Sequence, residues 1–338
     1  MKEQICVIGG GSWGATLADH LARQGNDVTI WEFLAPAAER LRATRTLSVM
    51  PELALHPGVQ VTSDLAPALA GKTLMVSAVP SEHVRATFRR VRETGAFSPQ
   101  GWIVSVTKGI ENQTLKRMTE VIAEELPGAQ GRTAVLAGPS HAEEVSRKIP
   151  TVVVAAGPAA LAEKVQGLFT SDAFRVYTNS DFVGVELGGA LKNVYAIACG
   201  ICDGLGLGDN TKAALMTRGL NEMTRLGATY GARLDTFFGL SGMGDLIVTC
   251  MSRHSRNRLL GEKIGQGKTL EKALSEMTMV AEGVPTTKSA YQLASRHGLD
   301  LPLAGELYRC LFEGKTARDS LRDLMLRPTH SEWEGEKP

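Results

Sequence analysis

The first half of the chain alternates between short apolar runs and longer amphipathic segments. Residues 5–8 are apolar and partly β-branched, which is typical of a strand buried on both faces. Residues 15–22 follow with apolar side chains at helical spacing. Segments of helical length, such as 81–93 and 113–125, separate further apolar runs, which predict strands at residues 28–31, 74–78, 103–106, 134–137, 151–155 and 174–177. This alternation predicts an α/β domain with a mostly parallel sheet covered by helices on both faces.

The pattern changes after about residue 179, where the strand-like runs mostly stop. Amphipathic segments joined by glycine-rich turns predict helices at residues 182–202, 212–230, 256–265, 269–277, 286–297 and 304–313. The chain is long enough for two domains with separate cores. We therefore expect an α/β domain at residues 1–180, an all-helical domain at 181–328 and a frayed polar tail at 329–338.

A glycine-rich turn joins the first predicted strand to the first predicted helix. Gly9, Gly11 and Gly14 fit the pattern G-x-G-x-x-G. In this pattern the first glycine permits a tight turn, the second lets the backbone approach a pyrophosphate, and the third lets helix and strand pack closely. The second strand ends at Glu32, about twenty residues further on, where a carboxylate accepts from ribose hydroxyls. These features predict a Rossmann-type, doubly wound dinucleotide-binding sheet. The alternative is an ordinary strand–turn–helix unit with an exposed glutamate.

The composition is that of an ordinary globular protein, and it bears on which kinds of partner to expect. The 338 residues are 43% hydrophobic and 22% charged with a net charge of +1, which gives no indication of nucleic-acid or membrane-surface binding. No uninterrupted apolar run approaches the ~18 residues that cross a bilayer, and the N-terminal apolar stretch does not fit a secretory signal. Five cysteines in no paired pattern indicate a reducing cytoplasm. Cys199 and Cys202 form a C-x-x-C without a second pair or a histidine partner, so we expect two buried helical cysteines.

Lys192 is a candidate for acid–base chemistry because it lies in an otherwise apolar predicted helix. Desolvation lowers the pKa of a lysine, and a second cation nearby lowers it further, which suits proton exchange with an alcohol or carbonyl near neutral pH. Gly188 and Gly189, one turn earlier, each cost about 1 kcal/mol relative to alanine and so indicate a close approach by backbone or ligand. The alternative is a lysine at the helix rim whose ammonium reaches water.

Two further segments carry candidate polar groups. Asp245 and Thr249 share one face if a helix begins at Asp245, although an aspartate after a glycine turn also suits a helix N-cap. Ser255, Arg256 and Asn257 open a predicted helix, where hydroxyl, guanidinium, amide and free N–H groups suit a phosphate. A capped helix with exposed basic residues is the alternative.

Small and polar residues follow three of the predicted strands, at residues 79–81, 107–109 and 138–142. The carboxyl ends of parallel strands form the ligand crevice in doubly wound sheets, so Lys108 is a candidate ligand contact. Turn chemistry accounts for Lys108 equally well, and it is the better explanation of Val79 and Pro80.

In this order and spacing, the motifs resemble those of the NAD(P)-dependent glycerol-3-phosphate dehydrogenases in their bacterial form, over nearly the whole chain. The matching runs are residues 9–14, 107–109, 137–142, 186–193, 240–249, 255–257 and 280–284. The resemblance implies a Rossmann-type domain followed by an all-α domain like the C-terminal domain of 6-phosphogluconate dehydrogenase. It also implies hydride transfer between sn-glycerol 3-phosphate and dihydroxyacetone phosphate, and a supply of product to glycerophospholipid synthesis.

The resemblance also implies a role for each matching residue. Lys192 would donate the proton when dihydroxyacetone phosphate is reduced, Lys108 would touch substrate and cofactor and keep Lys192 weakly basic, and Asp245 would orient the substrate hydroxyls and Lys192. The substrate would further contact Gly138, Ser140, Asn193, Thr249, Ser255, Arg256 and Asn257. The dinucleotide would contact Gly9, Gly11, Ser12, Trp13, Gly14, Glu32, Phe33, Lys108, Ala142, Arg256, Val280 and Glu282. No metal is expected.

The segment Glu32-Phe33 departs from the family pattern, because bacterial members often carry arginine or histidine at the position of Phe33. Such a cation suits the 2′-phosphate of NADPH, whereas Glu32 would repel that phosphate and favour a free 2′-hydroxyl. We therefore expect NAD(H) or NADP(H), with a preference for NAD(H). Arg40, Arg42 and Arg45 lie further along the chain and remain candidates for reaching the 2′-phosphate.

Two other functions remain open from the sequence. A dehydrogenase of similar build acting on a β-hydroxyacid or a sugar acid would need a carboxylate-binding pair in place of residues 255–257. A non-catalytic dinucleotide sensor would need the glycine pattern but not Lys192. A small-molecule substrate is expected, without nucleic acid or membrane insertion. The family resemblance favours a homodimer. No apolar stripe in the sequence marks an interface for it.

Overall fold

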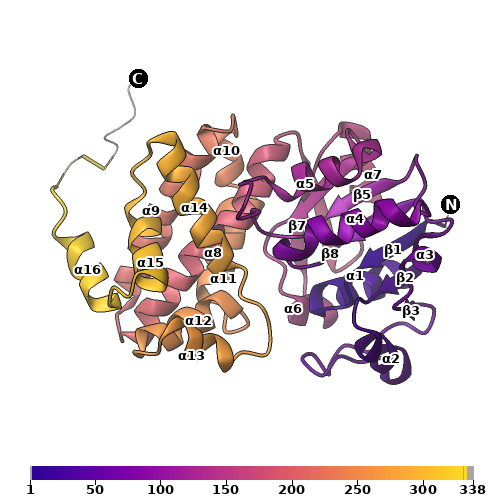
Figure 1. Ribbon diagram of the computed structural model, residues 1–338, viewed down its shortest axis with the longest axis horizontal. Helices are drawn as coiled ribbons and strands as arrows, with labels where there is room; N and C mark the ends of the chain where they lie inside the picture. The colour runs from indigo at the N-terminus through magenta and orange to yellow at the C-terminus, as the bar shows by residue number, and fades with distance from the viewer. Residues whose placement is uncertain (1, 330, 333–338) are drawn as a thin grey trace.

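The computed structural model describes residues 2–329 and 331–332, and it divides into a sheet-containing half and a helical half (Figure 1). Eight strands form one sheet in the order β3-β2-β1-β4-β5-β6-β7-β8. All neighbouring strands run parallel except β6 and β7, which pair antiparallel. The expected Rossmann-type, mostly parallel sheet is confirmed. Of the tail predicted at residues 329–338, residues 330 and 333–338 lie outside the described residues.

Each strand predicted from an apolar run is present, within two residues at either end. The strands are β1 (Gln4–Ile8), β2 (Asp27–Trp31), β3 (Gln60–Thr62), β4 (Leu74–Ser77), β5 (Trp102–Ser105), β6 (Thr133–Ala137), β7 (Thr151–Ala156) and β8 (Phe174–Asn179). Strand β3 is not among the predicted strands. That edge strand has three residues, of which only Val61 is buried, so it carries no apolar run.

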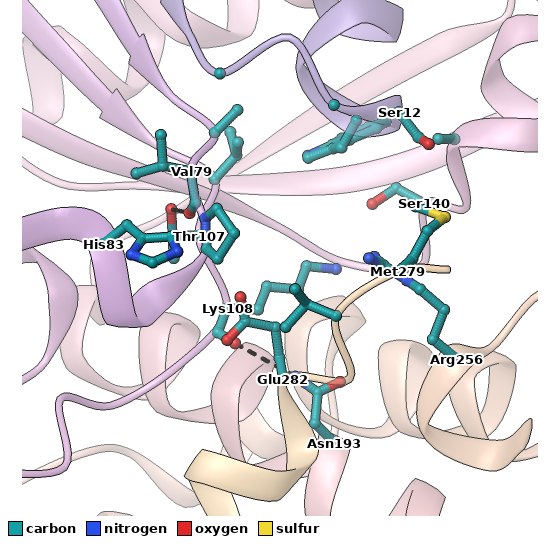
Figure 2. A pocket seen from close by; sticks show the side chains of 18 of the residues that line it. Ser12, Val79, His83, Thr107, Lys108, Ser140, Asn193, Arg256, Met279 and Glu282 are labelled. Atoms are coloured by element: carbon teal, nitrogen blue, oxygen red, sulfur yellow. Dashed lines mark hydrogen bonds between the residues drawn. The ribbon is translucent and has the colours of Figure 1, made fainter. Parts of the chain in front are cut away.

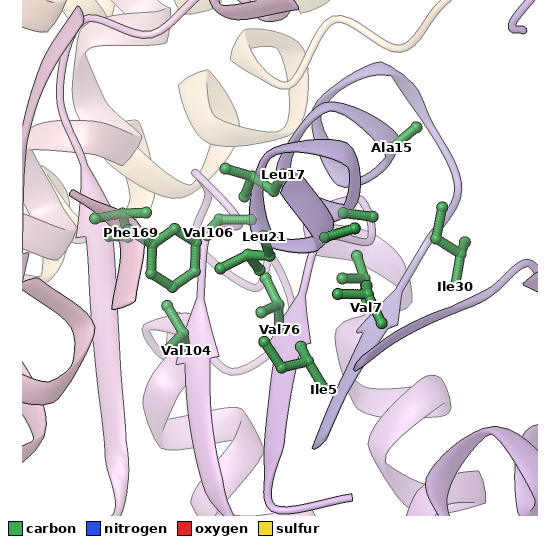
Figure 3. Close-up of a cluster of buried hydrophobic side chains, with 14 of the residues drawn as sticks. Ile5, Val7, Ala15, Leu17, Leu21, Ile30, Val76, Val104, Val106 and Phe169 are labelled. Atoms are coloured by element: carbon green, nitrogen blue, oxygen red, sulfur yellow. The ribbon is translucent and has the colours of Figure 1, made fainter. Parts of the chain in front are cut away.

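Helices cover both faces of this sheet because alternate side chains of its strands point to opposite sides. Ile5 and Val7 of β1 pack under α1, as Figure 3 shows, whereas Cys6 and Ile8 pack against the helices of the other face. The helices of this half are α1 (Ser12–Arg23), α2 (Ala35–Thr44), α3 (Leu65–Leu69), α4 (Val84–Thr94), α5 (Met118–Glu125), α6 (Ala142–Ser146) and α7 (Ala159–Phe169), with 3-10 turns η1 (Ser81–His83) and η2 (Pro127–Ala129). Burial on both sides explains why the strands are continuously apolar.

The helix predicted at residues 113–125 is wrong in its first part, because α5 begins only at Met118. Leu115 has a positive φ of 61°, which a right-handed helix excludes, and Ile110 pairs with Arg117 in an isolated β-bridge. The polar spacing of this segment suited a helix, but the backbone makes a tight loop before it.

The second half is all-helical, as predicted. Its elements are α8 (Phe182–Gly204), α9 (Asp209–Ala228), α10 (Leu234–Phe237), a short π-helical segment η3 (Leu240–Gly244), α11 (Asp245–Met251), α12 (Arg256–Gly265), α13 (Leu270–Ser275), α14 (Gly283–His297), α15 (Pro302–Phe312) and α16 (Ala317–Met325). Helix α16 is not among the predicted helices, and it lies at the end of the molecule away from the sheet (Figure 1). Only one of its residues, Ser320, is buried, and the apolar side chain of Met325 is exposed.

Helix α8 runs through the middle of the helical half. Two helical stretches of the described chain are long and apolar enough to cross a bilayer, Phe182–Gly204 and Leu234–Met251. Of the most apolar 18 residues in each stretch, 83% are buried in the first and 44% in the second. Neither is an uninterrupted apolar run, since Glu186 and Lys192 interrupt the first and Asp245 the second. The burial of α8 is that of a central core helix.

Helices α8 and α12 touch backbone to backbone along a seam of four glycines, Gly200 and Gly204 on α8 and Gly261 and Gly265 on α12. A Cβ atom at Gly200 would lie 2.0 Å from the carbonyl oxygen of Arg258, and one at Gly261 would lie 2.0 Å from that of Ile197. No side chain fits at these positions unless the helices move apart. The first turn of α12 is therefore held at a fixed distance from α8.

Replacing Gly200 by alanine should destabilise the protein by about 1–3 kcal/mol or more, since the added methyl group forces the two backbones apart. The measurement is the melting temperature and the urea midpoint of the full chain. Gly167→Ala is the matched control, because Gly167 lies on the exposed face of α7 with nothing within 4 Å of the added atom. The free energy of unfolding of the control should rise by up to about 1 kcal/mol, because alanine favours a helix more than glycine does. Equal melting temperatures of the two variants would contradict the close backbone contact between α8 and α12.

Candidate active site between the two halves

A cleft of about 740 Å³ lies where the carboxyl ends of the strands face the helical half (Figure 2). In Figure 2, Ser12 approaches it from the α/β side, and Asn193, Arg256 and Glu282 approach it from the helical side. The predicted site residues that line it are Gly9, Gly11, Ser12, Trp13, Glu32, Phe33, Lys108, Ser140, Ala142, Lys192, Asn193, Asp245, Thr249, Ser255, Arg256, Asn257, Val280 and Glu282. Of the predicted site residues, Gly14 and Gly138 do not line it. Their backbones contact residues that do, namely Gly9 and Lys108.

The glycine turn fits a dinucleotide pyrophosphate. Gly9 has a φ of +106°, and a Cβ at Gly14 would lie 2.0 Å from the Gly9 carbonyl oxygen, so both positions require glycine. A Cβ at Gly11 would meet nothing within 4 Å, which leaves that backbone open towards the cleft. The hydroxyl of Ser12 is buried and has no hydrogen-bond partner within residues 2–329 and 331–332. It lies at the first turn of α1, where N–H groups and the helix dipole favour a phosphate.

Glu32 stands at the end of β2, and backbone hydrogen bonds fix its carboxylate. One oxygen accepts from the Gly10 N–H at 2.9 Å and the other from the Leu34 N–H at 3.1 Å. The carboxylate therefore braces the glycine turn while it faces the cleft. Phe33 beside it is 63% exposed and also lines the cleft.

The arginines that the sequence analysis considered near the 2′ position lie elsewhere. Arg42 pairs with Glu39 on the exposed surface of α2, and Arg45 donates to the carbonyl oxygens of His56 and Val59. None of Arg40, Arg42 and Arg45 lines the cleft. No contact supports the suggestion that one of them reaches this part of the site.

Two lysines from different halves of the molecule converge on one buried carboxylate. Lys192 Nζ lies 2.5 Å from Asp245 Oδ1, and Lys108 Nζ lies 2.6 Å from Asp245 Oδ2. Asp245 is 1% exposed and Lys192 is 5% exposed. Lys108 also donates to the carbonyl oxygen of Gly138 at 3.1 Å, which explains how Gly138 contributes without lining the cleft. The alternative of Lys192 at a helix rim in water is wrong.

The environment lowers the pKa of Lys192 to about 8, chiefly through burial. The charge of Asp245 opposes this change, and the charge of Lys108 adds to it. Burial alone would raise the pKa of Asp245, but the two lysines outweigh burial and hold that pKa below its usual range. At neutral pH Asp245 is an anion, and Lys192 is a cation close to its titration point.

The local backbone explains how Asp245 reaches Lys192. Helix α11 begins at Asp245, but no side chain caps it, so the N-cap interpretation of Asp245 is wrong. The hydroxyl of Thr249, one turn later, donates to the Asp245 carbonyl at 2.6 Å and accepts from Lys192 at 2.5 Å. A Cβ at Gly188 would lie 2.8 Å from the carbonyl oxygen of Ser241, so the expected close approach is real there. Gly189 has only ordinary contacts.

The segment at the start of α12 combines a cap, a free cation and a buried amide. Ser255 accepts from the Arg258 N–H at 3.2 Å, so it caps the helix as well as lining the cleft. Arg256 is exposed and makes no hydrogen bond or ion pair with the described part of the chain. Asn257 instead donates to Asn193 at 2.9 Å and accepts from the Gly283 N–H at 2.8 Å. Its amide thus joins α8, α12 and α14, with one N–H left for a ligand.

Two polar contacts between the two halves have no counterpart in the sequence analysis. The Glu282 carboxylate accepts from the backbone N–H of Ser81 at 3.0 Å and from the Ser81 hydroxyl, which joins α14 to the loop after β4. Buried Glu186 on α8 accepts from the Thr119 N–H at 2.9 Å and pairs with Arg117 at 2.8 Å, which joins α8 to the start of α5. No local signal could have paired residues so far apart in the chain.

His141 is a further cleft residue to which the sequence analysis gave no role, although it lies within a matching motif. Burial lowers its pKa to about 4, and the charges of Lys192 and Lys108 act in the same direction, so the ring is neutral at pH 7. Its Nε2 atom is buried and has no hydrogen-bond partner in the part of the chain that the structure describes. Cys199 and Cys202 are buried on α8 as free thiols, as expected.

Comparison with known proteins identifies the family. The family model for the N-terminus of NAD-dependent glycerol-3-phosphate dehydrogenase matches residues 4–162. The family model for the C-terminus matches residues 181–322. The glycerol-3-phosphate dehydrogenase [NAD(P)+] of Geobacter sulfurreducens is 51% identical over 335 residues, which cover 98% of this chain and 99% of that protein. An enzyme of the same name from Salinibacter ruber is 50% identical over 98% of this chain and 97% of its own length.

Solved structures agree with these matches. The crystal structure of glycerol-3-phosphate dehydrogenase from Coxiella burnetii superposes with a TM-score of 0.92 at 34% identity, over 96% of this chain and 99% of that one. A ketopantoate reductase family protein from Ralstonia eutropha, at 15% identity and a TM-score of 0.61 over 96% of this chain and all of that one, shares the fold alone. With both family models matched and half of its residues identical to full-length relatives, this chain belongs to the NAD-dependent glycerol-3-phosphate dehydrogenase family.

Proposed function

We propose that this protein transfers a hydride reversibly between a nicotinamide dinucleotide and the C2 carbon that links dihydroxyacetone phosphate and sn-glycerol 3-phosphate. The observation that carries the proposal is the buried pair of Lys192 and Asp245 at the junction of the dinucleotide cleft with the start of α12. The bound nicotinamide supplies the hydride. Residues 1–180 hold the dinucleotide in this proposal, and residues 181–328 supply most of the substrate contacts.

Lys192 is the proposed proton donor and acceptor. Its ammonium gives a proton to the carbonyl oxygen of dihydroxyacetone phosphate as negative charge develops there, and the neutral amine takes the proton back in the reverse direction. A pKa of about 8 places both forms within the physiological range. Lys108 adds a second positive charge beside the same oxygen. Asp245 orients both lysines through its two oxygens.

The substrate phosphate is assigned to the start of α12. The Arg256 guanidinium there has no partner among the residues that the structure describes, and the Ser255 hydroxyl and the first N–H groups of the helix favour an anion. A phosphate fits these groups better than a carboxylate does, because it has enough oxygens to accept from the guanidinium, the hydroxyl and the helix N–H groups together. This favours a phosphorylated substrate over a β-hydroxyacid or a sugar acid.

Oxidation of NADH and of NADPH, followed by absorbance with dihydroxyacetone phosphate as acceptor, tests the proposal. We expect turnover with at least one reduced dinucleotide and none with β-ketoacids. A folded protein that binds dinucleotide but turns over neither would support the sensor alternative. Turnover of a β-ketoacid in place of the phosphate ester would support the other dehydrogenase.

Replacing Arg256 by alanine should raise the KM for dihydroxyacetone phosphate roughly tenfold or more, the loss expected for a charge-assisted hydrogen bond. The KM for the dinucleotide should change far less, and steady-state kinetics with each substrate varied in turn separates the two. Arg253→Ala is the matched control, because Arg253 is exposed on the preceding loop and does not line the cleft. Equal increases in both KM values would place the phosphate elsewhere.

We further propose a cytoplasmic enzyme whose sn-glycerol 3-phosphate supplies glycerophospholipid synthesis, and a homodimer in solution. The cysteine pattern supports the compartment, and the family resemblance supports the dimer. Light scattering of the purified chain tests the dimer directly, with a mass of one chain as the contrary result.

A further inference from the structure

Arg90 on α4 places a positive charge at the same end of the cleft as Glu32 and Phe33. Its side chain lines the cleft, and its guanidinium carbon lies 5.0 Å from the ring centre of Phe33 and 5.3 Å from that of Trp31. Both distances fall within the ~6 Å of a cation–π contact. The guanidinium makes no hydrogen bond or ion pair with any residue of 2–329 or 331–332. All of its N–H groups remain available to a ligand.

The two aromatic rings hold this guanidinium in one place. Trp31 is 1% exposed, and its indole N–H donates to the Ser63 carbonyl oxygen at 2.9 Å. The Phe33 ring stands edge-on to Trp31, with 6.1 Å between the ring centres. Because burial and this hydrogen bond restrain the Trp31 ring, a cation packed on its face is oriented before any ligand arrives, which reduces the entropy lost on binding.

The position of Arg90 matters because the end of the second strand is where this fold distinguishes the two dinucleotides. A carboxylate there binds the free 2′-hydroxyl of NAD(H), and an arginine nearby accommodates the 2′-phosphate of NADP(H). Glu32 and Arg90 bring both groups to the same end of the cleft. The backbone N–H bonds to Glu32 prevent its carboxylate from swinging away, so a phosphate that enters needs a cation beside it.

We propose that Arg90 binds the 2′-phosphate of NADP(H) and is the residue that lets this chain accept NADP(H) in spite of Glu32. A planar guanidinium offers two parallel N–H bonds to phosphate oxygens. Glu32 continues to favour NAD(H), so Arg90 extends the range of the cofactor rather than reversing the preference. The inference rests on the proposed function only in requiring that the cleft binds a nicotinamide dinucleotide.

Calorimetric titration with two cofactor fragments tests this without any turnover. Adenosine 2′,5′-bisphosphate carries the 2′-phosphate and adenosine 5′-monophosphate does not. In Arg90→Ala, we expect the Kd of the bisphosphate to rise roughly ten- to a hundredfold, the range for lost charge-assisted hydrogen bonds. The Kd of the monophosphate should change less than about threefold, and kcat/KM with NADPH should fall relative to NADH by the same factor as the bisphosphate affinity.

Arg40→Ala is the matched control, since it removes the same charge from an exposed site on α2 outside the cleft, and it should leave both fragments unaffected. Arg90→Lys keeps the positive charge but not the planar guanidinium, so it should lose less affinity for the bisphosphate than Arg90→Ala. Equal weakening of both fragments in Arg90→Ala would overturn the assignment, as would wild-type protein that binds the bisphosphate no more tightly than the monophosphate. A protein inactive on dihydroxyacetone phosphate that still shows the Arg90 effect would refute the proposed reaction and leave this inference standing.

Discussion

Replacing Lys192 by methionine should lower kcat at least about a hundredfold in both directions, the low end of what a positioned acid–base group contributes. Methionine keeps the length and apolar stem of lysine but has no proton to give. Asp245 keeps Lys108 as a partner at 2.6 Å, so the substitution does not leave a buried carboxylate unpaired. Steady-state rates with dihydroxyacetone phosphate and with sn-glycerol 3-phosphate measure the effect, alongside calorimetric binding of the dinucleotide, which should be unchanged.

Lys212→Met is the matched control for this substitution. Lys212 is a partly buried lysine of the helical half that pairs with Asp203 at 2.8 Å and lies outside the cleft. Its variant should keep wild-type turnover. If Lys192→Met folds, binds dinucleotide and retains a rate within tenfold of the wild type, Lys192 is not the proton donor.

Replacing Asp245 by asparagine should move the pH dependence of the reaction as well as its rate. In the proposed reaction, reduction of dihydroxyacetone phosphate needs protonated Lys192. Its rate should therefore fall as the pH rises through about 8, and the rate of oxidation of sn-glycerol 3-phosphate should rise over the same range. Asp245 raises the pKa of Lys192, so its neutralisation lowers that pKa further. The fall in the reductive rate should therefore occur at a lower pH in the variant, and kcat at neutral pH should drop roughly tenfold to a hundredfold because the two lysines lose their shared anchor.

Profiles of kcat against pH in both directions measure this change. A variant whose rate drops without any displacement of the profile would mean that Asp245 acts only on the packing of α11. The control is Asp203→Asn, which removes a carboxylate paired with Lys212 and Arg258 away from the cleft. That variant should keep the wild-type profile, even where it melts at a lower temperature.

Much of the fold could be predicted from the sequence because its signals are local. Strands buried on both faces leave continuous apolar runs such as residues 5–8, and the glycine pattern follows from contacts made within a few residues. Gly14 meets the backbone of Gly9, for example, five positions earlier. Elements without a local signal were missed or misplaced. Strand β3 buries only Val61, and the start of α5 depends on the positive φ of Leu115 rather than on side-chain periodicity.

The site was harder to predict, since its properties come from contacts across the two halves. The sequence offered Lys192 in an apolar helix, but whether its ammonium reaches water depends on where α11 and the loop after β5 lie. The roles of Ser81 and Asn257 rest on partners in distant segments, Glu282 in one case and Asn193 in the other. Arg90 had no motif at all, because it becomes notable only when Trp31 and Phe33 are seen beside it.

If Lys192 and Arg256 hold the two ends of the substrate as proposed, the glycine seam between α8 and α12 sets a fixed length for it. Lys192 belongs to one of these helices and Arg256 to the other, and the backbones touch at Gly200 and Gly261 with no room to slide or spread. A phosphorylated ketone with one more carbon would have to leave either the ammonium or the phosphate ligands. Chain-length selectivity would then be a property of helix spacing, and it would be altered by substitutions in the seam, remote from every atom of the substrate.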